Sequence, residues 1–74
     1  MNSYGVVLFY NTSSVMRAEK VLQKNGIVVK LIPTPREFSS DCGMAIRFDL
    51  PDQERVRHWL DQAHVEVAEI HAMQ

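Results

Sequence analysis

The side chains best suited to chemistry gather in one stretch of this 74-residue chain, residues 33–43, with the sequence PTPREFSSDCG. It holds the only cysteine, Cys42, together with one cation and several hydroxyls: Arg36, Thr34, Ser39 and Ser40. A cysteine reacts as its thiolate, which a nearby cation or converging backbone N–H groups stabilise. Gly43 follows the thiol directly and would let the backbone turn and a partner come close. A nucleophilic thiol in a loop is therefore one hypothesis.

The same residues allow two other interpretations. Arg36 with three hydroxyls and turn N–H groups would form an anion pocket, and the loop at residues 33–43 would then bind a phosphate or carboxylate without covalent chemistry. Alternatively, Cys42 only packs, because cysteine is among the most buried residue types. The alternation of the following strand favours packing, since it places Cys42 on one face with Ile46 and Phe48. Asp41 would oppose ionisation of the thiol unless it pairs with Arg36.

Several other chemistries lack the residues that they need. His58, His64 and His71 do not share a metal-ligand spacing with one another or with Cys42, so we expect no metal and no cofactor. No Ser-His-Asp set and no paired carboxylates are recognisable, which favours a non-catalytic carrier or binding domain over an enzyme. The formal net charge of −1 argues against a nucleic-acid partner.

Composition indicates one small domain over residues 1–74, with 46% apolar and 23% charged residues. No apolar run approaches the ~20 residues that span a bilayer, and the N-terminus lacks the zones of a signal peptide, so we expect no membrane association. One cysteine cannot form an intramolecular disulfide, and the reducing cytoplasm is the expected location.

The first half of the chain predicts a strand, a helix and a strand. Residues 4–10 form a continuous apolar run typical of a central strand. Residues 14–24 follow a group of N-capping residues and show helical spacing, and Gly26 suits the left-handed position after the last turn. Residues 27–32 then predict a second strand.

The second half of the chain again predicts a strand, a helix and a strand. Residues 44–49 alternate as a half-buried strand, and Pro51 suits the first turn of a second helix. That helix carries one apolar stripe: Val56, Trp59, Leu60 and Ala63. Residues 65–72 predict a last strand. The order β-α-β-β-α-β with right-handed crossovers predicts an α+β, ferredoxin-like fold, a four-stranded antiparallel sheet with two helices on one face.

Such a fold leaves the other face of the sheet without helices. Residues of the first strand, Val6 and Leu8 or Val7 and Phe9, would then be exposed, and soluble proteins usually cover such a patch. Two alternatives follow. The protein forms a homodimer through this face or a sheet edge, or its own loop folds back over the face.

Residues 31–48, LIPTPREFSSDCGMAIRF, and the helical Ala18-Glu19-Lys20 resemble the selenium/sulfur carrier protein-like family of short bacterial proteins. The resemblance covers residues 4 to about 67, and its specific part is the motif Pro-Thr-Pro-Arg followed by Ser-x-x-Cys-Gly. It implies that Cys42 carries sulfur or selenium as a persulfide or selenosulfide. It further implies Arg36, Ser39, Ser40 and Gly43 as its loop partners, and a donor or acceptor protein as the binding partner.

Overall fold

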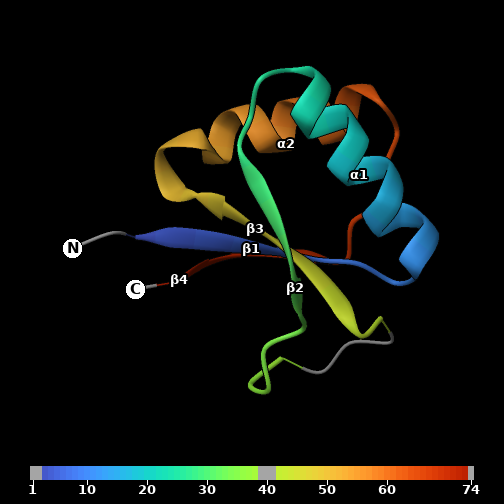
Figure 1. Cartoon of the computed structure of the whole chain (residues 1–74), viewed down its shortest axis with the longest axis vertical. Helices are drawn as coiled ribbons and strands as arrows, with labels where there is room; N and C mark the ends of the chain where they lie inside the picture. The colour runs from blue at the N-terminus through green and yellow to red at the C-terminus, as the bar shows by residue number, and fades with distance from the viewer. Residues whose placement is uncertain (1–2, 39–41, 74) are drawn as a thin grey trace.

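The computed structural model describes residues 3–38 and 42–73 of the chain (Figure 1). Its elements alternate in the predicted order: β1 (Tyr4–Leu8), α1 (Thr12–Lys24), β2 (Val29–Pro33), β3 (Met44–Asp49), a 3-10 turn (Leu50–Asp52), α2 (Gln53–Gln62) and β4 (Glu69–Met73). The four strands form one antiparallel sheet in the order β2-β3-β1-β4. The predicted α+β ferredoxin-like fold is therefore confirmed.

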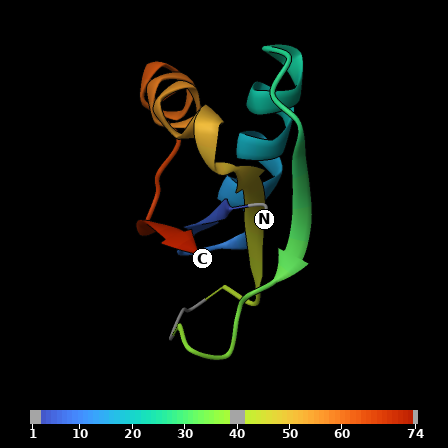
Figure 2. The ribbon, with the colours of Figure 1, turned by 90° about the vertical axis from the view of Figure 1, so that its left-hand side faces the viewer.

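Both helices cover the same face of the sheet, and the β2–β3 loop extends from the opposite side (Figures 1 and 2). The main core lies between this face and the helices. It contains Val7 and Phe9 from the β1 segment, Ile46 and Phe48 from β3, and the inner residues of both helices: Val15, Ala18, Leu22, Val56 and Leu60. Trp59 is only half-buried against this core, although its helical spacing predicts full burial.

Local signals set the ends of both helices. Asn11 caps α1, since its side-chain oxygen accepts a hydrogen bond from the Ser14 N–H at 2.9 Å. Gly26 takes a φ of 77° after the last turn of α1, as predicted. At the end of α2 the left-handed position falls instead to His64, with a φ of 55°. The Val65 N–H then donates to the Leu60 carbonyl at 3.0 Å, which closes the helix. The sequence predicts the last strand from residue 65, but β4 begins at Glu69 because residues 64–65 still belong to the end of the helix.

Gly5 leaves room for a neighbouring aromatic ring. It lies opposite Phe48 in the register of β1 and β3, and the Phe48 ring fills the space where a side chain would be. A Cβ on Gly5 would lie against Phe48 Cζ and 2.7 Å from Phe48 Cε2. Since Phe48 is 1% exposed, this glycine allows the largest β3 side chain to enter the core.

Candidate functional site

Thr34 fixes the end of the β2–β3 loop that carries the cysteine. Its N–H donates to the Gly43 carbonyl at 3.0 Å, and its hydroxyl donates to the Cys42 carbonyl at 2.8 Å. The first bond lies directly beyond the Pro33–Met44 pair of the ladder, and the second adds a side-chain bond to the neighbouring carbonyl. The backbone at Cys42 and Gly43 is thereby held against the start of the loop.

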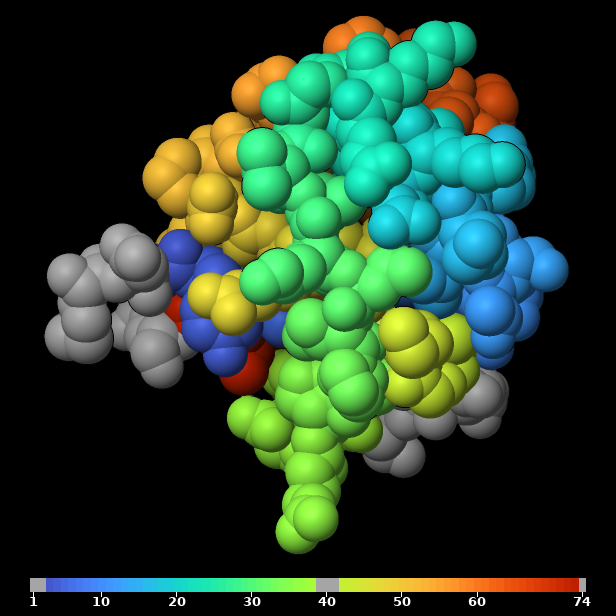
Figure 3. Space-filling model, in the orientation of Figure 1, coloured from blue at the N-terminus to red at the C-terminus, as the bar shows by residue number. Residues whose placement is uncertain are grey.

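The Cys42 side chain is buried, with 3% of the residue exposed, and it belongs to the main core with Phe9, Val15 and Ile46. A carrier thiol requires access, whereas the packing alternative expects a buried side chain, and in this conformation Cys42 is buried. The cause is the alternation of β3: extended back by two residues, it directs position 42 to the same side as Ile46, toward the helices. The space-filling view shows the segment around residues 42–44 against the start of α1 (Figure 3).

Arg36 lies away from the core, exposed in a turn that the Phe38 N–H closes on the Pro35 carbonyl at 3.0 Å. Within residues 3–38 and 42–73, its guanidinium forms no ion pair or hydrogen bond. Arg47, the other candidate cation for the thiol, lies on the opposite face of β3 and stacks over the Tyr4 ring at 4.2 Å. Among the described residues, neither arginine therefore forms the ion pair with a Cys42 thiolate that the thiol hypothesis predicts.

The predicted loop residues divide into three groups. Thr34, Cys42 and Gly43 are brought together by the two hydrogen bonds above. Arg36 stands apart from them in its turn. Ser39 and Ser40, with Asp41, lie outside the described residues, so their expected roles stay predictions.

Gly43 is exposed, and a Cβ built on it would meet nothing within 4 Å. Its φ lies outside the left-handed region, so the fold itself does not require glycine at this position. A bare backbone beside the cysteine leaves room for another molecule to approach. The approach of a partner at Gly43 stays a prediction.

Phe38 is a loop residue whose role the sequence reasoning missed. It packs against a second buried cluster on the helix-free face of the sheet, formed by Val6, Leu8 and Ala45, and its ring stacks on His71 with centroids 4.3 Å apart. Figure 2 shows the loop passing below the sheet near β4. Of the two alternatives for this face, the structure matches the one in which the loop folds back: Val6 is 0% and Leu8 is 1% exposed, and Phe38 is among the side chains that pack over them. Phe38 is the only large apolar residue between Pro35 and Cys42, a signal that could have identified it.

The described residues lack two further features. No helix there is long and apolar enough to cross a membrane. In the same part of the chain, no three His, Cys, Asp or Glu side chains come together in a way that could hold a metal ion.

Comparison with known proteins gives one family. The family model described as "Putative Se/S carrier protein-like" matches residues 4–72. Among curated proteins, an uncharacterized protein of Methanocaldococcus jannaschii is 33% identical over 57 residues, which cover 77% of this chain and 28% of that relative. The chain therefore spans well under half the length of this relative. No solved structure matches the chain at a significant level.

Proposed function

The chain belongs to the Se/S carrier protein-like family, and from this premise we propose that it carries sulfur or selenium on Cys42. The observation that carries the proposal is the extent of the match. It spans residues 4–72 and so includes the whole β2–β3 loop and the only cysteine in the sequence. A chalcogen carried covalently by a side chain of this chain has Cys42 as its natural attachment point.

The proposed transfer moves one sulfur atom without net oxidation. The Cys42 thiolate attacks the outer sulfur of a donor persulfide, a new S–S bond forms to Cys42 Sγ, and the donor S–S bond breaks. The donor leaves as a thiolate. An acceptor nucleophile then attacks the outer sulfur, and Cys42 leaves as a thiolate in turn. A selenium atom would move by the same exchange.

Burial of Cys42 sets a condition on this chemistry. With 3% of Cys42 exposed, the closed conformation would shield a bound sulfur from water and small thiols, and loading requires local opening. The two hydrogen bonds from Thr34 lie on the backbone that must move. Gly43 supports this proposal, because a partner can approach its bare backbone at the point where opening would expose the sulfur.

The partner in this proposal is a protein that supplies or receives the chalcogen in the reducing cytoplasm, where a single cysteine stays reduced. Self-association remains a proposal only at the sheet edges, because the apolar part of the helix-free face is covered by Phe38. β2 is one such edge, and the residue before it, Val28, is 76% exposed.

A second function is favoured by a specific observation. Cys42 is buried, whereas Arg36 is exposed and forms no ion pair within the described ranges. These are the features of a loop that binds a phosphate or carboxylate without covalent chemistry. In this module Cys42 would only pack.

Two variants distinguish the functions after incubation with glutathione persulfide, with loading measured by intact mass. The carrier proposal expects a cyanide-sensitive sulfur adduct on the wild type and on Arg36→Ala, and none on Cys42→Ser. The binding-module proposal expects no adduct on any of them. It expects instead that phosphate changes the NMR spectrum of isotope-labelled protein. This change is kept in Cys42→Ser and lost in Arg36→Ala.

A further inference from the structure

The face of the sheet opposite the helices carries one row of aligned side chains. In the registers of the three strand pairs, Lys30 lies opposite Arg47, Arg47 opposite Val6, and Val6 opposite His71. The row therefore crosses all four strands, with Val6 as the buried member between Arg47 and His71. Lys30 and Arg47 are exposed, and His71 is half-buried.

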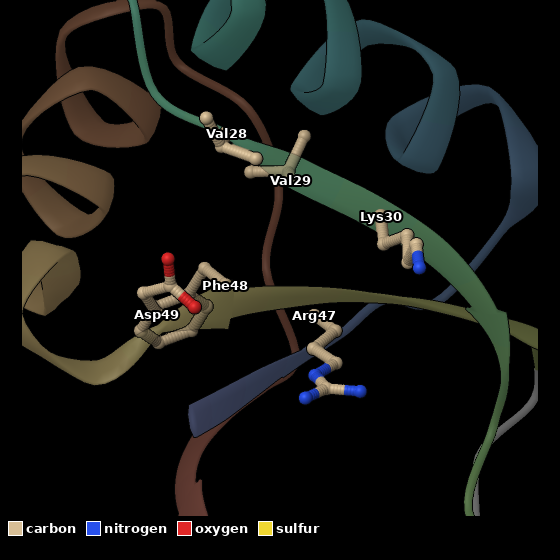
Figure 4. A pocket seen from close by; sticks show the side chains of 6 residues that line it. All are labelled: Val28, Val29, Lys30, Arg47, Phe48 and Asp49. Atoms are coloured by element: carbon tan, nitrogen blue, oxygen red, sulfur yellow. The ribbon is translucent and has the colours of Figure 1, made fainter. Parts of the chain in front are cut away.

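Lys30 and Arg47 form an unneutralised pair of cations. Like charges directly opposite each other in a sheet cost stability, so the pairing of Lys30 with Arg47 does not itself stabilise the fold. Within the described part of the chain, neither has an ion-pair partner. Figure 4 shows the two side chains next to each other on the adjacent strands, pointing away from the helices. Asp49 lines the same hollow, and Glu69 bonds His71 at 2.8 Å, so the cationic part is confined to Lys30 and Arg47.

The same row presents two planar groups, each backed by an aromatic ring. The Arg47 guanidinium carbon lies 4.2 Å from the Tyr4 ring centroid, and the His71 ring lies 4.3 Å from Phe38 at an interplanar angle of 19°. Two strand spacings separate Arg47 from His71, roughly 10 Å. Guanidinium planes and imidazole rings are groups on which unpaired nucleobases stack.

The hollow on this face is small for a site that encloses a small molecule. The hollow beside Lys30 and Arg47 has a volume of about 230 Å³. Typical small-molecule sites have about 300–1,000 Å³ and enclose their ligand. An extended chain that lies across the sheet would instead reach the three polar members of the row, Lys30, Arg47 and His71, with Val6 buried beneath it.

We propose that this face binds single-stranded nucleic acid, with bases on Arg47 and His71 and phosphates beside Lys30 and Arg47. The net charge of −1 argues against nucleic-acid binding by the surface as a whole, but it does not describe the charge of this one face. The row contains Lys30, His71 and Arg47, which is both a cation and a backed planar group. The fold also brings in Tyr4 and Phe38, which lie outside β3.

The test is fluorescence anisotropy with a labelled eight-nucleotide RNA of mixed sequence, at increasing salt. We expect a dissociation constant on the order of 10–100 µM at about 50 mM salt. The variant K30Q/R47Q should weaken binding at least tenfold and flatten the salt dependence, whose wild-type slope for two phosphate contacts is about −1.4. The matched control K20Q/R57Q loses the same charge from exposed helix positions and should change binding less than twofold.

A third variant, His71→Ala, tests stacking and should weaken binding about tenfold. Single-stranded DNA of the same sequence should also bind, because every base has a face that stacks. The proposal is overturned by no wild-type binding at 1 mM protein, by equal losses in K30Q/R47Q and K20Q/R57Q, or by equal affinity for duplex RNA. Unchanged circular dichroism shows that each variant is folded.

Discussion

The bond from the Thr34 hydroxyl to the Cys42 carbonyl gives a quantitative prediction about access to the thiol. Alkylation of Cys42 requires an open state that breaks at least this bond, at 2.8 Å, and the Thr34 N–H bond to Gly43, at 3.0 Å. Each contributes about 0.5–1.5 kcal/mol. Burial of the thiol adds about 1–2 kcal/mol by analogy with other small apolar side chains. The opening free energy is then about 2–5 kcal/mol, which slows alkylation about 30-fold to several thousand-fold relative to a model thiol.

Thr34→Val keeps the shape of the side chain and removes only the hydroxyl bond. A loss of about 1 kcal/mol in opening free energy should accelerate alkylation about fivefold. The assay is the rate of iodoacetamide labelling by mass spectrometry, with Thr12→Val at an exposed helix position as the control.

Low concentrations of urea distinguish the kind of opening. Local opening exposes little surface, so the labelling rate should stay nearly constant well below the unfolding transition. Labelling at the wild-type rate in Thr34→Val, or labelling that follows global unfolding at every urea concentration, would refute a loop that opens locally.

Four further substitutions test the packing and the loop. Gly5→Ala forces the Phe48 ring to move and should cost about 1–3 kcal/mol of unfolding free energy by chemical denaturation. Gly43→Ala meets nothing within 4 Å and should leave stability equal or raise it by about 0.4–1 kcal/mol, while slowing persulfide transfer to a protein acceptor if a partner approaches there. Asn11→Ala removes the cap of α1 and should cost about 1 kcal/mol, checked by the same denaturation. Phe38→Ala uncovers the second buried cluster, so sedimentation should detect stronger self-association than in the wild type at the same concentration.

The fold could be predicted because its signals are local and repeated. The apolar run of β1 indicates a central strand, and β1 does lie between β3 and β4. Asn11 and Gly26 mark the ends of α1 by chemistry that needs no tertiary information. The end of α2 was less predictable, because His64 takes a left-handed conformation that usually belongs to glycine.

The loop that carries the candidate site could be located from the sequence, whereas the contacts around it could not. The sequence places Cys42 and Gly43 in the β2–β3 loop, and the alternation of β3 already favours a buried thiol. It does not give the partners that come from other elements, since Phe38 meets His71 and Arg47 meets Tyr4 only after the sheet forms. Contacts between residues far apart in the chain depend on register, which hydrophobic pattern alone does not fix to the residue.

The most direct test of the carrier proposal is the intact mass of the protein purified from cells without reductant. The proposal predicts a fraction heavier by one sulfur or selenium atom, located on the peptide with Cys42 and removed by cyanide. Cys42→Ser, purified in parallel, should show only the unmodified mass. A wild-type protein of unmodified mass that also fails to accept sulfur from glutathione persulfide, while folded and while Cys42 labels with iodoacetamide, would contradict the proposal.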